Sequence, residues 1–156
     1  PRSNVFLRSG IMPLRQYLRE GFRIGLGTDV GAGYSLSLLE EARWACEMAK
    51  LRALLAPEEE PTELSAEEAL WLATLGGASA LGLEHTIGSL EVGKDADFIV
   101  LDTTALEPAR PLWQEPSHLL ARLLYTASPS AVRAVFVRGH ELFRRSPLQE
   151  PYSGIS

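Results

Sequence analysis

A short apolar run that ends in a carboxylate limits the fold of this chain more than any other feature. The run covers residues 23–28, Asp29 follows it, and residues 30–33 hold two glycines. Such a run is typical of a buried strand, and the glycines cannot continue it. A helical pattern begins near Ser37, so Asp29 is predicted to lie at the mouth of a strand-to-helix loop. In α/β barrels this end of the strands forms the catalytic rim, which makes Asp29 a candidate functional residue.

Helix start and stop signals flank this run. Residues 3–10 carry turn residues and predict a loop. Pro13 suits the first turn of a helix and Gly21 the position just past its end, which predicts a short helix over residues 13–20.

The capping-box pattern, a serine followed three residues later by a glutamate, occurs at Ser37 and again at Ser65. In this pattern the two side chains satisfy amide groups that a helix start leaves free. The first box predicts a helix to about residue 55, with small residues at spacings of three and four on one face for packing on a sheet. The second predicts another helix, in which the glycine pair 76–77 is tolerated because it approaches another backbone closely.

The chain changes character near residue 85, where a β-rich part begins. We expect strands over residues 87–92, 97–102, 132–137 and 141–143, and a short helix over residues 117–126. The last two strands are expected to form a hairpin, which is marginally stable alone and so predicts a larger sheet. The first part shows only one barrel-type strand, whereas a whole barrel takes about 250 residues. We therefore expect the C-terminal part of a longer enzyme.

The composition is that of a globular protein. The 156 residues are 46% hydrophobic and carry a formal net charge of −5. No basic stripe is present to neutralise phosphates, and no apolar segment reaches the roughly 18–20 residues of a membrane span. The single cysteine, Cys46, excludes an internal disulfide and suits a reducing compartment. We therefore expect a cytoplasmic protein with no nucleic-acid or membrane partner.

Asp29 could bind a metal, but the sequence offers it few partners. Taken alone it could be a helix N-cap, a turn residue or a metal ligand that also moves a proton. The histidines are His85, His118 and His140, and no two have the close spacing of a ligand pair. A catalytic zinc usually takes three protein ligands. We therefore expect the histidines to cap elements or face solvent, and we expect no complete zinc site within this chain alone.

Several blocks of the sequence resemble the amidohydrolase superfamily. They are residues 1–10, 25–35, 68–83 and 87–98. The last block resembles many members of the superfamily. Residues 27–33 and 74–78 together resemble the guanine deaminase family more narrowly, with Ala32 and Tyr34 where that family often has glycine and threonine.

The resemblance implies a specific chemistry. It is the hydrolytic deamination of an aminopurine, guanine to xanthine and ammonia, as a step of purine catabolism at a single zinc ion. Asp29 matches the family's metal-binding aspartate at the end of the eighth barrel strand, where it ligates zinc and takes a proton from the bound water. The family's histidine ligands and its glutamate acid/base lie upstream of anything in this chain. No substrate-binding residue is assigned.

The implied fold class is α/β. Residues 1–85 would be the C-terminal part of a metal-dependent (β/α)8 barrel, with its last strand and the following helices. Residues 86–156 would be part of a small β-sandwich with a short helix. The implied partners are an aminopurine substrate, the missing N-terminal part of the same enzyme and a second copy in a homodimer, and the isolated chain is expected to be inactive.

Two alternatives stay open. Another amidohydrolase deaminase would act on cytosine, a triazine or an adenosine-like substrate. In a different class of function, the chain is a non-catalytic fragment or one half of a split enzyme, as the missing metal ligands suggest.

Overall fold

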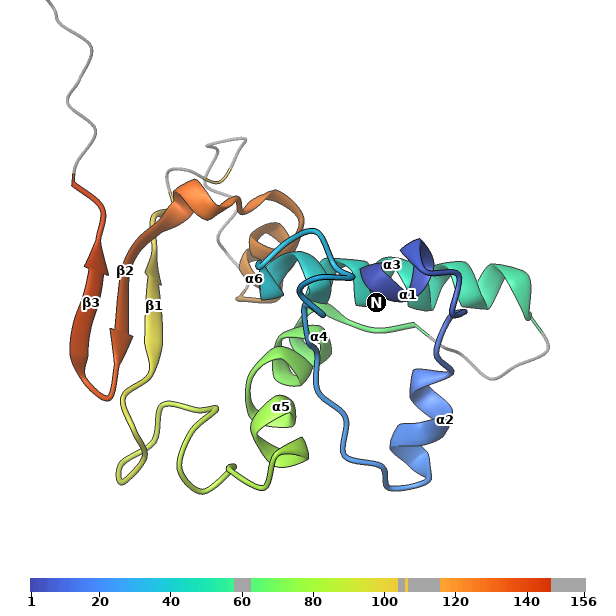
Figure 1. Cartoon of the computed structure of the whole chain (residues 1–156), viewed down its shortest axis with the longest axis horizontal. Helices are drawn as coiled ribbons and strands as arrows, with labels where there is room; N and C mark the ends of the chain where they lie inside the picture. Colours follow the sequence, from blue (N-terminus) through green and yellow to red (C-terminus); the bar gives the residue numbers. More distant parts are fainter. Residues whose placement is uncertain (58–62, 104–105, 107–115, 147–156) are drawn as a thin grey trace, which may run out of the picture.

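The structure places a group of helices beside a small antiparallel sheet (Figure 1). It is a computed structural model that describes residues 1–57, 63–103, 106 and 116–146. In chain order the elements are α1 (Arg2–Phe6), α2 (Leu14–Arg19), α3 (Leu38–Leu55), α4 (Ala66–Ala73), α5 (Leu75–Ala80), β1 (Phe98–Leu101), α6 (Pro116–Thr126), the 3-10 turn η2 (Pro129–Ala131), β2 (Val132–Val137) and β3 (His140–Arg144).

The core lies where α3 packs against α4 and α6. Its buried members are Ala42, Ala45, Cys46, Ala49, Leu64, Ala69, Leu72 and Leu124. The predicted small-residue face of α3 therefore exists, but it packs on helices rather than on a sheet. Small side chains let helix axes approach closely, and Ile24 and Leu26 fill the side of this core.

Both predicted helix starts are confirmed. The Ser65 side chain accepts a hydrogen bond from the Glu68 amide, and the Glu68 carboxylate accepts one from the Ser65 amide, which completes a capping box. At α3 only half of the box forms: the Ser37 hydroxyl accepts from the Glu40 amide at 3.3 Å. The Glu40 carboxylate turns instead to Arg2, whose Nη2 lies 2.6 Å from it.

The strand predicted over residues 23–28 is not present. The Asp29 segment (residues 23–29) runs between α2 and the helices α4 and α5 without ladder pairing (Figure 1). Its backbone bond to the core is from the Leu26 amide to the Leu72 carbonyl, at 3.1 Å. A strand needs a neighbour about 4.8 Å away, and the described residues provide none beside this segment. Within the described residues, Ile24 and Leu26 of this apolar pattern pack on the core.

Three other predictions differ in the helical part or beside it. The predicted loop over residues 3–10 begins with α1, so its first residues are helical. The second long helix breaks at Thr74, whose φ of −127° and ψ of −99° are not helical, and α5 follows as a separate helix. No strand forms over residues 87–92, because Gly88 has a positive φ of 94° and the chain turns back on itself there.

The sheet has the order β1-β2-β3, with both pairs antiparallel. The predicted hairpin is confirmed as β2 and β3, and the strand predicted over residues 97–102 appears as β1. The partner of β1 is β2 rather than the preceding segment, and Phe98 stacks on Phe136 across this pair with ring centroids 4.5 Å apart. The helix predicted over residues 117–126 is confirmed as α6.

Membrane-spanning helices are not found in the described part of the chain, where no helix combines the necessary length and apolar character.

Two backbones approach each other closely at Gly25 and Gly77. A Cβ added to Gly25 would lie 2.6 Å from the Cα of Gly77, which is shorter than any normal carbon contact. This confirms that the glycine pair 76–77 accompanies a close backbone approach. The contact fixes the Asp29 segment against α5.

We predict that Gly25→Ala lowers the free energy of unfolding by about 1–3 kcal/mol, because the methyl group overpacks the contact with Gly77. Gly27→Ala is the matched control, since a Cβ there meets nothing within 4 Å. The control should leave stability unchanged or raise it by up to about 1 kcal/mol. Urea unfolding of the purified protein measures both, and equal stabilities of the two variants would contradict the predicted contact.

Candidate functional site

Asp29 occupies an exposed turn at the end of the Asp29 segment. Its φ is +50°, in the left-handed region that aspartate tolerates better than most residues. The Asp29 carbonyl accepts hydrogen bonds from the amides of Ala32, at 3.1 Å, and Gly33, at 2.5 Å. Gly33 allows this turn because a Cβ there would lie 2.0 Å from the Thr28 carbonyl oxygen. Local backbone geometry therefore sets the position of the carboxylate.

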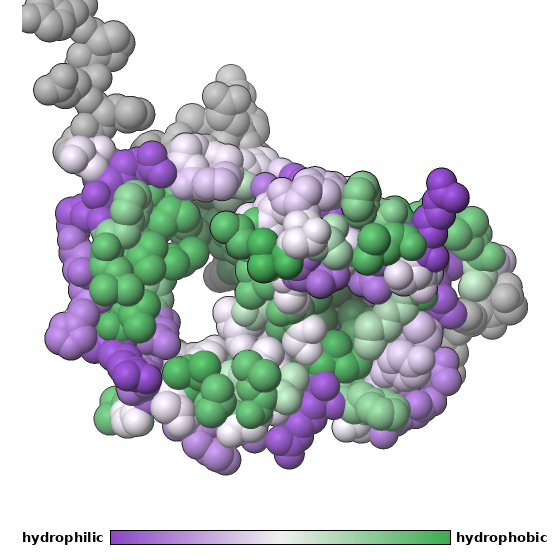
Figure 2. Space-filling model, viewed as in Figure 1, coloured by the Kyte–Doolittle hydropathy of each residue, from purple (hydrophilic) through white to green (hydrophobic). Residues whose placement is uncertain are grey.

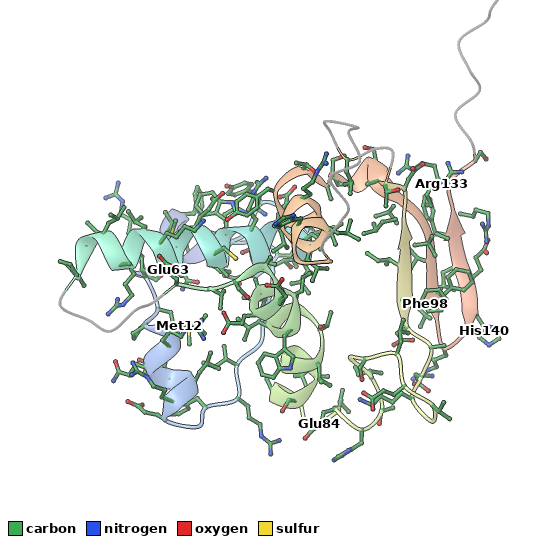
Figure 3. The ribbon with its side chains drawn as sticks, turned by 180° about the vertical axis from the view of Figure 1, so that it is seen from behind. Met12, Glu63, Glu84, Phe98, Arg133 and His140 are labelled. Atoms are coloured by element: carbon green, nitrogen blue, oxygen red, sulfur yellow. The ribbon has the colours of Figure 1, made fainter. Side chains whose placement is uncertain are left out.

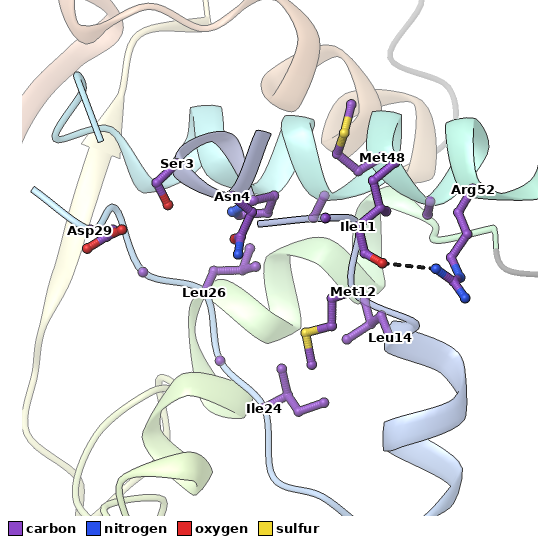
Figure 4. Close-up of a pocket in the computed structure, with 16 residues that line it drawn as sticks. Ser3, Asn4, Ile11, Met12, Leu14, Ile24, Leu26, Asp29, Met48 and Arg52 are labelled. Atoms are coloured by element: carbon purple, nitrogen blue, oxygen red, sulfur yellow. Dashed lines mark hydrogen bonds between the residues drawn. The ribbon is translucent and has the colours of Figure 1, made fainter. Parts of the chain in front are cut away.

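A cavity of about 420 Å³ extends from Asp29 between the Asp29 segment, the N-terminal residues and α3. Figure 4 shows Asp29 and Ser3 towards one end of it and Arg52 towards the other. Arg52 donates a hydrogen bond to the Ile11 carbonyl at 2.9 Å. The middle is mainly apolar, and among the described residues that line the cavity Asp29 is the only carboxylate. An apolar cavity with a few polar groups suits a small molecule or an apolar segment of a protein.

Beside this cavity lies a charge cluster, the Arg2 cluster (Arg2, Tyr34, Glu40 and Glu41), in which Arg2 and Glu41 are buried. The Arg2 guanidinium donates to Glu41 Oε1 at 3.0 Å and to Glu40 Oε2 at 2.6 Å, and it lies 4.6 Å from the centroid of the Tyr34 ring. Burial opposes the charge of Arg2, but the hydrogen bond to Glu40 and the other contacts raise the Arg2 pKa above its ordinary value. The hydrogen bond from Arg2 in turn lowers the pKa of Glu40.

Sequence reasoning missed the Arg2 cluster because Arg2 lies 38 residues from Glu40 and 39 residues from Glu41 in the chain. One local signal was available: Glu41 falls on the same helical face as Ala42, Ala45 and Ala49, where a charge is costly unless it is paired.

The three histidines are exposed and far from Asp29 in the chain. His85 follows α5, His118 is in α6, and His140 lies at the hairpin turn on the far side of the sheet from the helices (Figure 3). Within the residues that the structure describes, no three His, Cys, Asp or Glu side chains are placed to hold a metal together. Asp29 could therefore supply one oxygen ligand to a metal, and the remaining ligands would come from outside these residues.

Cys46 does not serve as a nucleophile in this structure. Its side chain is only 2% exposed, and burial raises the pKa of its thiol. The Sγ atom lies 3.7 Å from the Ser65 carbonyl oxygen, inside the contact between α3 and α4.

Comparison with protein families gives a match to the Amidohydrolase family over residues 1–142. Among curated proteins, the chain is 37% identical over 150 residues to a 5-methylthioadenosine/S-adenosylhomocysteine deaminase of Moorella thermoacetica, covering 96% of this chain and 33% of that protein. It is 38% identical over 137 residues to the guanine deaminase of Escherichia coli, covering 88% of this chain and 27% of that protein. The chain thus spans between 27% and 33% of the length of these relatives.

Solved structures show the same relationship. The E. coli guanine deaminase structure matches with a TM-score of 0.79 and 32% identity, covering 94% of this chain and 33% of that one. An adenosine deaminase from Xanthomonas campestris with bound zinc matches with a TM-score of 0.76 and 38% identity, covering 90% of this chain and 30% of that one. These likenesses support an α/β enzyme fold for the protein to which the chain belongs.

We predict that Glu40→Gln lowers the free energy of unfolding by about 1 kcal/mol at pH 7. Because the folded pKa of Glu40 is depressed, this contribution exists above the unfolded pKa and is lost as pH falls through the folded pKa. The difference from wild type should therefore shrink between pH 5 and pH 3. Urea unfolding at several pH values measures it.

The matched control is Glu47→Gln, on the same helix, where the carboxylate lies 3.9 Å from Arg43. It should change stability by less than about 0.5 kcal/mol, as exposed pairs do. A pH-independent loss in Glu40→Gln would show that the ion pair with Arg2 does not stabilise the fold.

Proposed function

The chain belongs to the amidohydrolase family, and from this premise we propose that it is the C-terminal part of a zinc-dependent enzyme that deaminates guanine to xanthine and ammonia. The observation that carries the proposal is the placement of Asp29 at the cavity, in a turn that Gly33 permits at the end of the Asp29 segment. Guanine deaminases among the relatives support the choice of substrate, including a structure from C. acetobutylicum with bound guanine.

Asp29 would supply an oxygen ligand to the zinc and would accept a proton from the attacking water. Zinc bound at such a site makes water acidic enough to act near neutral pH. In the overall reaction the water oxygen bonds to the purine carbon that carries the amino group, the C–N bond breaks, and the nitrogen leaves as ammonia. The carboxylate of Asp29 would pass the proton to that nitrogen before the C–N bond breaks, so that the nitrogen can leave as ammonia.

The other parts of the enzyme would complete both halves of this chain. The Asp29 segment would become the last strand of a (β/α)8 barrel when neighbouring strands pair with its backbone. Apolar side chains from those strands would then fill the part of the cavity that lies between this segment and α3. The part of the cavity near Asp29 would open to the substrate. The cavity would be divided in this way because α3 would lie outside such a barrel, whereas Asp29 would lie at the end of its strand.

The sheet would become part of a small β-sandwich with strands from the N-terminal part. Figure 2 shows apolar side chains gathered over the sheet. Its exposed large apolar residues are Ile99, Val100, Val137, Leu142 and Phe143. Three strands with such a surface are favoured to pack on further strands. The proposal also includes a cytoplasmic homodimer that takes part in purine catabolism.

We predict that Asp29→Asn in the full-length enzyme lowers kcat by at least about a hundredfold, because asparagine cannot accept the proton. The thermal midpoint should stay close to that of wild type, since the side chain is exposed. Asp95→Asn is the control, as its carboxylate lies 3.4 Å from Arg138 and outside the cavity. More than about a hundredth of wild-type kcat in Asp29→Asn would refute the role.

A substrate panel tests the choice of amine. We expect the full-length enzyme to release ammonia with a higher kcat/KM from guanine than from 5-methylthioadenosine, S-adenosylhomocysteine, adenosine, cytosine or a triazine. The second candidate function is deamination of 5-methylthioadenosine or S-adenosylhomocysteine, which a relative of similar identity favours. If either of these compounds gave a higher kcat/KM than guanine, that compound would become the assigned substrate.

A further inference from the structure

We propose that Glu41 is a positioning residue for Asp29, acting through Arg2 and Tyr34 on the loop that follows Asp29. The proposal rests on the proposed function for its effect on turnover, while the contacts themselves are independent of it.

Glu41 is the fixed end of this chain of contacts. It is 1% exposed and lies on the core-facing side of α3. Its Oε1 accepts from Arg2 Nε at 3.0 Å, and its Oε2 accepts from the Arg2 amide at 3.1 Å. One carboxylate therefore holds both the side chain and the backbone of Arg2, which is itself 5% exposed.

Arg2 carries the contact on to the Asp29 loop (residues 30–37). Its guanidinium lies 4.6 Å from the centroid of the Tyr34 ring, which is a cation–π distance. Tyr34 is 66% exposed, and its ring also meets that of Phe6 edge-on at 6.3 Å. The loop thus rests on one side of α1 through the Tyr34 ring.

Tyr34 stands next to the turn that sets Asp29. Gly33 precedes it, and the Gly33 amide donates to the Asp29 carbonyl at 2.5 Å. The left-handed backbone of Asp29 costs some free energy even for an aspartate, so contacts around the turn help to hold it there. Release of Tyr34 would let the turn relax and would move the carboxylate, and a displacement of about 1 Å at a reacting group can reduce turnover by up to about a hundredfold.

A second arginine–glutamate pair provides a matched control. Arg15 binds Glu68 through two bonds of 2.5 and 2.6 Å and joins α2 to the start of α4. This pair consists of the same two kinds of side chain, although it is more exposed than Arg2 and Glu41, and none of these Arg15 hydrogen bonds reaches the Asp29 loop. Glu68→Gln therefore removes the same charge without releasing the loop.

The experiment compares Glu41→Gln with Glu68→Gln in the full-length enzyme. Hydrogen–deuterium exchange of the Ala32 and Gly33 amides reports on the turn, and steady-state kinetics with guanine reports on Asp29. In Glu41→Gln we expect exchange at least about tenfold faster, kcat lower by tenfold or more and KM within threefold. In Glu68→Gln we expect wild-type values for all three. Unchanged exchange in Glu41→Gln, or equal changes in both variants, would overturn the proposal, as would a higher KM at constant kcat.

A surface variant covers the case in which Glu41→Gln does not fold. Tyr34→Ala should accelerate exchange of the same amides and lower kcat about two- to fivefold, whereas Tyr34→Phe keeps the ring and should restore wild-type exchange. Equal exchange in the two Tyr34 variants would refute the role of the ring. A wild-type enzyme that deaminates no amine would refute the proposed function instead, and the exchange data would still decide whether the Arg2 cluster holds the turn.

Discussion

The close packing of α3 against α4 and α6 is the constraint on which the rest of the structure depends. Alanines and Cys46 line the contact face, so the helices approach without large side chains between them. The Asp29 segment lies against the side of this core through Ile24 and Leu26, and Gly25 brings it to the backbone of Gly77. Because the segment is anchored along its length, the turn at its end has a defined place from which Asp29 can act.

The features that sequence reasoning predicted correctly are those that depend on near neighbours in the chain. The Ser65–Glu68 box, the end of α3 at Leu55 and the hairpin of β2 and β3 each follow from residues a few positions apart. The strand predicted over residues 23–28 is not formed within the described residues, because its pairing depends on neighbouring strands that these residues do not contain.

The candidate site likewise contains one feature that depends on near neighbours in the chain and one that does not. The location of Asp29 after an apolar segment and before a helix was predictable, because local glycines and the Ser37 cap mark it. The Arg2 cluster was not predictable, because Arg2 and Glu41 lie 39 residues apart in the chain. Their contact depends on how α1 lies across α3 (Figure 1). The metal-binding role of Asp29 and the division of the chain at residue 85 stay predictions. That the chain is the C-terminal part of the enzyme also stays a prediction.

The ion pair of Arg2 and Glu41 lies at a face of α3 that otherwise consists of small apolar residues. Two charges removed from water gain little net stability from their attraction, and an apolar pair of similar volume often serves a core equally well. An apolar pair, however, makes no directed contacts. It could not hold the backbone amide of residue 2 and place a guanidinium against an aromatic ring, as Glu41 and Arg2 do. In the Arg2 cluster those directed contacts end at Tyr34, which directly follows the Asp29–Gly33 turn. On our proposal, the orientation of Asp29 is therefore the property that this buried charge maintains, and stability is secondary to it.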